Sequence, residues 1–198
     1  MQLATNPLRI GAIVLAAGAS RRMGRNKMLL TLDGEPLVRR AARRAHAAGF
    51  SPVIVVIGNE AEQVRATLAG VECTCVENPE FAGPTTSSLH VGLRQLPDDV
   101  TAVVVILADM VHVTEAMLQA MLETARTSEA PLVVSQYGET IAPPLLFRRP
   151  LFAELLAWRG EGAGKQVVQR HRAEAAIVDW PSAALVDVDT PEDWARLR

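Results

Sequence analysis

A basic, glycine-bearing loop is the first feature of the sequence that could do chemistry. The stretch from Leu15 to Lys27 follows an apolar run and holds four basic residues, with Gly18 and Gly24 among them. Glycines let a backbone approach phosphate oxygens closely, and successive N–H groups form an anion-binding concavity. Arg22 offers a guanidinium fork for phosphate, and Lys27 offers a compact charge. The alternative is an ordinary solvated loop, and composition alone does not decide between the two.

Two familiar phosphate-binding loops are absent from this position. No GxGxxG follows the first apolar run, so the dinucleotide-binding fingerprint is missing. The GxxxxGK[ST] pattern is also missing, because Gly24 is followed by Arg25 and Asn26. The loop therefore belongs to a different class of anion site.

Asp109 is the second candidate, since it directly follows the apolar run VVVILA. A carboxylate at that point is costly unless it is solvated at the edge of the sheet or holds a cation. Mg²⁺ held by one or two carboxylates and by substrate phosphates fits such a position. The alternative is that Asp109 caps the turn that follows the strand.

A third candidate lies in the acidic segment DVDTPED at residues 187–193. The segment falls at a strand-to-helix junction, with Pro191 at the first turn of the helix. Asp189 or Thr190 either caps this helix or, in the case of the aspartate, completes the cation site. The spacing leaves both interpretations open.

The elements that must position these residues alternate in type. Short apolar runs predict strands, and longer amphipathic runs predict helices. A βαβα order predicts a mostly parallel sheet with helices on both sides, so we expect a single three-layer α/β domain over residues 1–198. Ligands of such sheets bind outside the carboxyl ends of the strands, where the loop and Asp109 both fall. The predicted strands are 10–15, 53–57, 71–76, 103–107, 131–135, 175–178 and 184–188, with an extended segment at 145–147. The predicted helices are 37–48, 60–68, 87–96 with a serine N-cap, 114–126 capped by Thr114, 151–158, 163–171 and 191–197.

Composition excludes several classes of partner. Twenty basic and 22 acidic residues give a net charge of −2, which offers no general attraction to nucleic acid or to an anionic membrane. No stretch approaches the roughly 20 apolar residues of a membrane span. The apolar run near the N-terminus is about eight residues long and is followed at once by basic residues, so we expect no secretory signal and a cytoplasmic protein.

The loop also carries a resemblance to a known family. Its residues are similar to the LAAGxSxRMGxxKxLL signature of the molybdenum cofactor cytidylyltransferase-like nucleotidyltransferases. The segment SLHVGL at 88–93 is similar to the S-[LV]-x-x-G-L stretch of these enzymes, and residues 189–193 to their DTPED motif. The loop positions that match are Leu15, Ala16, Ala17, Gly18, Ser20, Arg22, Met23, Gly24, Lys27, Leu29 and Leu30.

The resemblance implies a Rossmann-like nucleotidyltransferase that uses Mg²⁺ and a nucleoside triphosphate and releases pyrophosphate. It assigns catalytic roles to Arg22, Lys27 and Asp109, and it makes Asp109 and Asp189 the metal ligands. An acceptor phosphate would attack the α-phosphorus in line, so no general base is required. The nucleotide-binding residues that it implies are Leu15, Ala16, Ala17, Gly18, Ser20, Gly24, Asn78, Gly83 and Ser88.

The expected donor and acceptor follow from the same resemblance. LAAG rather than LAGG in the loop resembles the cytidine-using branch and favours CTP, and the acceptor would be a molybdopterin-type or similar phosphorylated small molecule. The alternatives are a GTP-using relative, an enzyme acting on a sugar phosphate or phospholactate-type acceptor, and a non-catalytic module that binds and delivers a nucleotide or cofactor. Lys27 and Asp109 together argue against the last, because binding alone would not require both.

The sequence departs from the family pattern in three places. Ala108, Met110 and Val111 flank Asp109 where relatives commonly read GDQP. Ala142-Pro143-Pro144 stands in place of GHP, and residues 160–165 read GEGAGK in place of GDxGAR. These changes fall in the half of the sequence that would face the acceptor.

Overall fold

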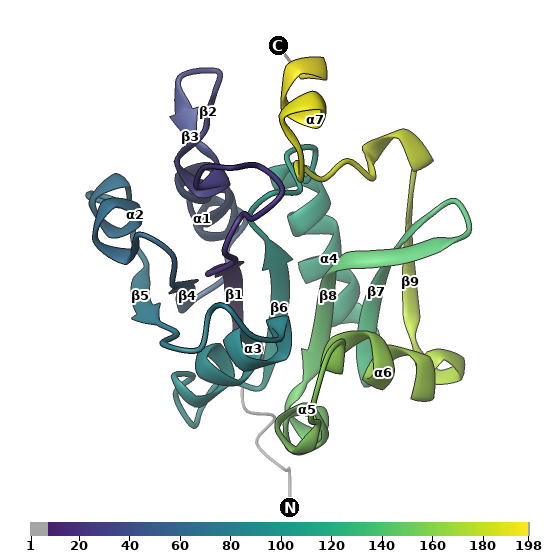
Figure 1. Ribbon diagram of the computed structural model, residues 1–198. Helices are drawn as coiled ribbons and strands as arrows, with labels where there is room; N and C mark the ends of the chain where they lie inside the picture. Colours follow the sequence, from purple (N-terminus) through teal and green to yellow (C-terminus); the bar gives the residue numbers. More distant parts are fainter. Residues whose placement is uncertain (1–7, 198) are drawn as a thin grey trace, which may run out of the picture.

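A seven-stranded mixed sheet is the centre of the computed structural model, which describes residues 8–197 (Figure 1). The ends of the predicted domain, residues 1–7 and 198, lie outside the described residues. The strand order is β5-β4-β1-β6-β8-β7-β9, and β8 runs antiparallel to both of its neighbours. The prediction of a mostly parallel α/β sheet is therefore confirmed. The strands are β1 (Ile10–Ala16), β4 (Val53–Ile57), β5 (Thr74–Glu77), β6 (Ala102–Leu107), β7 (Leu132–Tyr137), β8 (Thr140–Arg148) and β9 (Ala176–Trp180), and a separate hairpin pairs β2 (Thr31–Leu32) with β3 (Glu35–Pro36).

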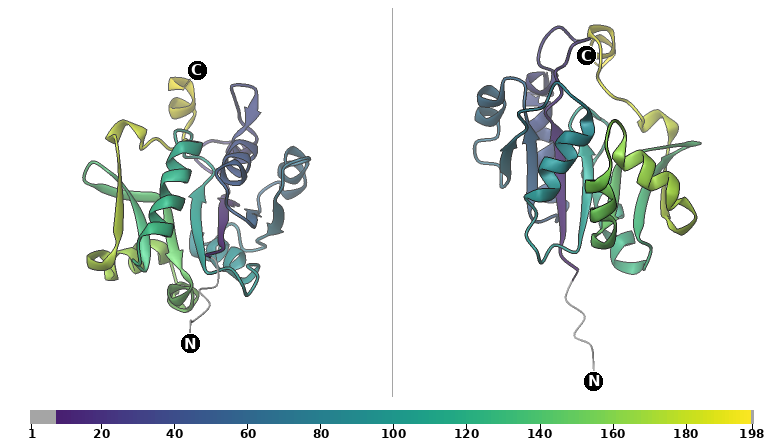
Figure 2. Two further views of the ribbon diagram at one scale, coloured as in Figure 1. Left: turned by 180° about the vertical axis from the view of Figure 1, so that it is seen from behind. Right: turned by 60° about the horizontal axis from the view of Figure 1, so that its bottom comes forward.

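Helices cover both faces of this sheet. Figure 1 shows α3 (Thr85–Arg94), α5 (Phe152–Ala157) and α6 (Ala163–Arg170) on one face, and the reverse view in Figure 2 shows α1 (Leu37–Ala47) and α4 (Glu115–Thr127) on the other. The short α2 (Ala61–Thr67) packs on the same face as α1 and α4. Because both faces are covered, central strands such as β4 are buried at every position, which explains their uninterrupted apolar sequence.

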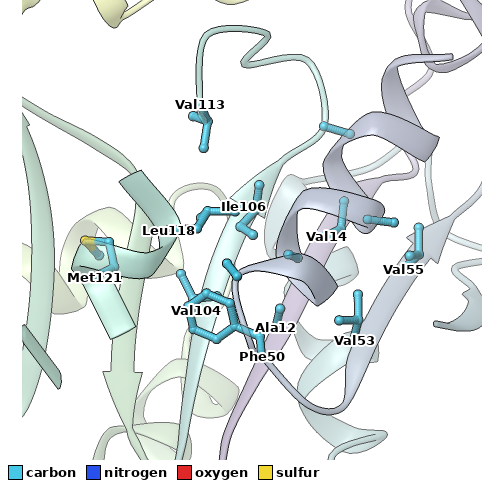
Figure 3. Packing of buried hydrophobic residues seen from close by; sticks show 14 of the residues in the cluster. Ala12, Val14, Phe50, Val53, Val55, Val104, Ile106, Val113, Leu118 and Met121 are labelled. Atoms are coloured by element: carbon cyan, nitrogen blue, oxygen red, sulfur yellow. The ribbon is translucent and has the colours of Figure 1, made fainter. Parts of the chain in front are cut away.

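Alternate residues of each strand build the core beneath α1 and α4 (Figure 3). Val14 of β1, Val55 of β4 and Ile106 of β6 all point to this face and are almost completely buried. Phe50 and Leu118 close the same core. The three parallel strands that end at the candidate site are thus held on a rigid support, which is how folds commonly present functional loops.

Several predicted helix ends are confirmed and one is wrong. Gly49 adopts φ 99° directly after α1, and the Thr114 hydroxyl oxygen accepts a hydrogen bond from the Met117 N–H, as an N-cap should. The helix predicted from residue 87 instead begins at Thr85, without a side-chain cap. Pro84 precedes it, and the fixed φ of proline favours the start of a helix two residues earlier than the serines suggest.

The chain after β9 differs most from the expectation. Residues 184–188 form no strand: a 3₁₀ turn, Ser182–Ala184, leads into irregular backbone that crosses toward the end of β6. There the Val188 N–H donates to the Asp109 carbonyl oxygen at 3.2 Å. The closing helix α7 (Pro191–Arg196) is confirmed, and its capping box is formed by Thr190 and Asp193.

The extended segment predicted at 145–147 is part of the nine-residue strand β8. Cys73 and Cys75 are free thiols at the edge of the sheet, half-buried against the core. Among residues 8–197, no helix has both the length and the apolar character that a membrane span requires.

We predict opposite effects for alanine at two helical glycines. At Gly92 of α3 an added Cβ would lie 2.7 Å from Ile13 Cγ2 of β1, so Gly92→Ala should lower the free energy of unfolding by roughly 1–3 kcal/mol. At Gly164 of α6 the nearest atom is Phe147 Cζ at 3.8 Å, so Gly164→Ala should be neutral or stabilising by up to about 1 kcal/mol. Urea unfolding measures both, and a Gly92→Ala variant as stable as the wild type contradicts the packing of α3 on β1.

Candidate functional site

A buried lysine joins three distant segments at the carboxyl ends of β1 and β6. Lys27 is only 9% exposed, and its ammonium group contacts the carboxylate of Asp109, 82 residues away. The same ammonium donates to Asp189 Oδ1 at 2.8 Å, and Arg22 Nη2 donates to Asp189 Oδ2 at 2.6 Å. The structure thus brings together the four charged residues that the resemblance singled out.

Backbone and apolar contacts hold these segments in place. Asp109 comes two residues after the last residue of β6, and the hydrogen bond from Val188 to its carbonyl fixes the next residue, Asp189, beside it. A small apolar cluster lies between the loop after β1, the start of α1 and the chain end. Its buried members are Met23, Leu30, Leu37, Val111, Val188 and Trp194. Met23, within the RMG motif, and Trp194, directly after the DTPED motif, therefore have a structural role in holding the two motifs together.

The loop after β1 is shaped by its own polar side chains. Ser20 adopts φ 50° and Gly24 φ 72°, and the Ser20 hydroxyl oxygen accepts a hydrogen bond from the Lys27 N–H at 3.1 Å. Asn26 is buried, accepts from the Met28 N–H, and donates to the Asn59 carbonyl oxygen at 2.8 Å. Gly18, by contrast, is exposed, and an added Cβ would meet no atom within 4 Å. Hydrogen bonds of Ser20 and Asn26 therefore order the loop, and its backbone is exposed at Gly18.

The charges of the cluster stabilise one another. Burial lowers the pKa of Lys27, but the negative charges and hydrogen bonds of Asp109 and Asp189 outweigh it, and the net effect raises this pKa. Burial raises the pKa of Asp189, but hydrogen bonds and charge from Lys27 and Arg22 outweigh it, and the net effect lowers this pKa. Both groups are consequently held in their charged forms at neutral pH.

The donor set suits a cation that is shared with a substrate. Asp109 and Asp189 are brought to a single ammonium group, and their side chains keep 15% and 28% of their surface exposed. No cluster of three or more histidine, cysteine, aspartate or glutamate side chains arranged to hold a metal occurs within residues 8–197. Two carboxylates without further protein ligands fit Mg²⁺, which commonly keeps water and phosphate oxygens in its coordination shell.

The segment predicted to lie near the base is organised around a buried asparagine. Asn78 is 1% exposed, and its amide nitrogen donates to the hydroxyls of Ser87 and Ser88 at 2.9 Å each. The amide oxygen accepts from the Glu80 N–H at 3.0 Å, so the side chain joins its own loop to the start of α3. Asn78 therefore fixes the shape of residues 78–83, and Gly83 is exposed at their end.

Gly58 is a residue of this region that sequence reasoning missed. A Cβ at Gly58 would lie 2.3 Å from Cβ of Phe81 and 2.9 Å from the Ala17 carbonyl oxygen. The glycine thus permits the close contact between the loop after β1 and the segment 78–83. A glycine directly after the buried strand β4 was the available signal, since glycine at a strand end often marks close approach of another backbone.

Beside the charged cluster, the structure contains a cavity of about 780 Å³ between α3, α6 and the sheet. Leu15, near the end of β1, and Leu107, at the end of β6, line it, and the loop of Lys27 and the turn of Asp109 follow these strands. Ala142 and Pro143 from β8 and residues 162–165 from the start of α6 line it as well. Two of the three departures from the family pattern therefore meet at one cavity.

The histidines stay outside this arrangement. His90 is buried in α3 with its Nε2 2.8 Å from the Leu155 carbonyl oxygen, as expected for a packed histidine. His112 is exposed and does not line the cavity.

Comparison with known proteins identifies the family. A family model, the MobA-like NTP transferase domain, matches residues 12–175. The chain belongs to this family. This MobA-like protein is similar to the probable molybdenum cofactor guanylyltransferase of Synechococcus elongatus. The two are 28% identical over 96% of this chain and 99% of the relative. The purine catabolism protein PucB of Bacillus subtilis is 27% identical over 98% of this chain and 97% of its own length.

Solved structures of similar chains confirm the fold of this MobA-like protein. The crystal structure of Rv0371c from Mycobacterium tuberculosis H37Rv is similar with a TM-score of 0.85 and 28% identity, covering 96% of this chain and 97% of the other. A structure of Rv0371c in complex with manganese is similar with a TM-score of 0.78 over the same coverage. The chain is a nucleotidyltransferase by family.

The lowered pKa of Asp189 predicts an acid-dependent contribution to stability. Because the folded pKa lies below the ordinary value of 3.8, the stabilisation from ionised Asp189 is fully present above pH 3.8. It is lost as the pH falls through the folded pKa. The excess stability of the wild type over Asp189→Asn should therefore be constant near neutral pH and shrink in acid. Chemical unfolding of both proteins across this pH range measures the difference between their free energies of unfolding. The titration of Asp193 is common to both proteins and cancels in this difference. A difference that does not change with pH contradicts the pairing of Asp189 with Lys27 and Arg22.

Proposed function

We propose that this MobA-like protein transfers the CMP unit of CTP to the phosphate of a small-molecule acceptor and releases pyrophosphate. The observation that carries the proposal is Lys27, buried and shared between Asp109 and Asp189, next to a loop that is open at Gly18. Cations and carboxylates gathered at one end of parallel strands suit phosphoryl chemistry, which depends on positioning and on electrostatic stabilisation.

The residues of the cluster take separate roles in this proposal. Gly18 and the backbone around it receive the triphosphate, and Arg22 and Lys27 balance its charge. Asp109 and Asp189 hold a divalent cation, for which manganese in the similar Rv0371c structure is supporting evidence. Bound there, Mg²⁺ would supply charge stabilisation at the triphosphate. The acceptor phosphate is already ionised at neutral pH, so its oxygen forms the new bond to the α-phosphorus while the bond to the pyrophosphate oxygen breaks.

The choice of base rests on the loop. Leu15 to Gly18 read LAAG, which resembles the cytidine-using branch of the family and supports CTP. GTP is the competing donor, because similar relatives from Synechococcus and Shewanella are named molybdenum cofactor guanylyltransferases. Ser88, together with the segment 78–83 that Asn78 shapes, would line the base in either case.

The acceptor we propose is a molybdopterin-type or similar phosphorylated small molecule, as the names of these relatives suggest. A sugar phosphate or phospholactate-type acceptor is the alternative within the same chemistry. A non-catalytic delivery module is the alternative outside it, and the Lys27–Asp109–Asp189 arrangement argues against that, because it exceeds what nucleotide binding needs.

We predict that Asp109→Asn abolishes nucleotide transfer while leaving the protein folded. The substitution keeps the size of the side chain and removes the charge that faces Lys27, so pyrophosphate release should fall at least about a hundredfold. The assay incubates the protein with Mg²⁺, each of the four common nucleoside triphosphates and a panel of phosphorylated acceptors, and it measures pyrophosphate.

Asp179→Asn is the matched control, since Asp179 is exposed on the edge strand β9, and it should behave as the wild type. Full activity of the Asp109→Asn variant would overturn the assignment of the site. Turnover with GTP and none with CTP would move the donor to guanosine.

Gly18→Ala tests the triphosphate loop without disturbing the fold. The φ of Gly18 is not positive and an added Cβ meets no atom within 4 Å, so the melting temperature should not change. The methyl group would occupy space that phosphate oxygens need, and triphosphate affinity should fall by about tenfold or more.

Gly34→Ala is the converse control for this variant. Gly34 has φ 80° in the turn between β2 and β3, so this change should cost roughly 1–2 kcal/mol of stability. It should leave nucleotide affinity unchanged. Calorimetric titration measures both affinities, and wild-type affinity in Gly18→Ala would show that the loop does not contact the triphosphate.

A further inference from the structure

The cavity beside the charged cluster has an apolar interior. Leu15, Leu107 and Leu145 from the sheet, Leu89 from α3 and Val168 from α6 all line it. Its volume of about 780 Å³ lies in the range of sites that hold drug-sized ligands. Thr85, Thr86 and Thr140 also line the cavity, but a polyhydroxylated body would leave most of its hydroxyl groups without partners against the apolar walls.

The mouth of the cavity carries positive charge on one face of α6. Lys165, Gln169 and Arg172 are spaced i, i+4 and i+7, so they lie on one side of α6 and the turn that follows it, and all three line the cavity. Each is exposed, and within the described part of the chain neither Lys165 nor Arg172 forms an ion pair. Arg170, on a different side of the same helix, instead pairs with Glu154.

The acidic residue that lines the cavity does not neutralise the charges of Lys165 and Arg172. Glu139, at the tip of the β7–β8 hairpin, also lines the cavity and is exposed, and it forms no salt bridge with either cation. Two unpaired cations therefore face one carboxylate, and the mouth is open to an anion.

The reacting groups adjoin the cavity through β1 and β6. Leu15 and Leu107 line the cavity and lead directly into the loop after β1 and the turn of Asp109. A ligand whose phosphate reaches Asp109 would extend its body across the apolar walls, with its far end at Lys165 and Arg172.

We propose that the acceptor has an apolar or flat aromatic body and a second anionic group, and that Lys165 and Arg172 bind this second group. The two cations are specificity-determining residues, and sugar phosphates are poor substrates. The identification of this ligand as the acceptor rests on the proposed function. Binding in the cavity can be measured without catalysis.

Two dyes with nearly the same aromatic body test the cavity directly. Anilinonaphthalene sulfonate carries one negative charge, and phenylnaphthylamine carries none; both fluoresce in apolar pockets. The wild type should bind the sulfonate more tightly than the neutral dye, and this preference should shrink as salt is added. In the double variant Lys165→Ala, Arg172→Ala, affinity for the sulfonate should fall by about tenfold while affinity for the neutral dye stays the same.

Arg170→Ala is the matched control, because it removes a cation from the same helix outside the cavity and should leave both affinities unchanged. Circular dichroism checks that each variant is folded. The proposal is overturned if the wild type binds neither dye, if the double variant binds the sulfonate as the wild type does, or if Arg170→Ala weakens it equally. Failure of the pyrophosphate assay would remove the proposed function and leave these results untouched, and failure of the dyes would leave nucleotide transfer standing.

Discussion

The buried ammonium group of Lys27 is the constraint on which the site depends. A buried charge is costly unless it is paired and hydrogen-bonded, and both partners of Lys27 come from distant parts of the chain. The loop after β1, the end of β6 and the segment around Asp189 must therefore be fixed relative to one another. The apolar cluster of Met23, Val188 and Trp194 does this, so a few buried side chains maintain the electrostatics of the site.

Charge balance within the cluster has a consequence for the proposed function. Lys27 and Arg22 bring two positive charges, and Asp109 and Asp189 bring two negative ones, so the four groups neutralise one another. A triphosphate that pairs with Lys27 and Arg22 leaves the two carboxylates without a counter-charge. A divalent metal ion bound by the carboxylates likewise leaves Lys27 and Arg22 without a counter-charge. Each ligand therefore favours the other, which is how a site can recognise the metal complex of a nucleotide rather than either part.

The predictions succeeded where the information is local and failed where it is not. The buried strand β4 is fully apolar and was predicted with its observed bounds, because both faces of the central sheet are covered. Residues 184–188 are apolar except for Asp187, and they form no strand. Val186 and Val188 pack instead on the cluster that contains Met23, a contact with a distant residue that the local sequence does not show. Gly58 shows the same limit: its neighbours Phe81 and Ala17 are far away in sequence, so the need for glycine arises only in the fold.

The same difference explains why the donor half of the site can be read from the sequence and the acceptor half cannot. In the proposed function the triphosphate loop is one continuous stretch whose backbone does the binding, so its residue types are constrained together and form a signature. The cavity is built from five elements, and β8 is central to it because an antiparallel strand brings its first residues to the edge where β1 and β6 end. Its walls need only be apolar and its mouth only cationic, requirements that many residue combinations meet. In the proposed function, specificity for the acceptor is thus set by the shape and charge of an assembled surface, and it would change through substitutions at Lys165 or Arg172 that leave the donor site intact.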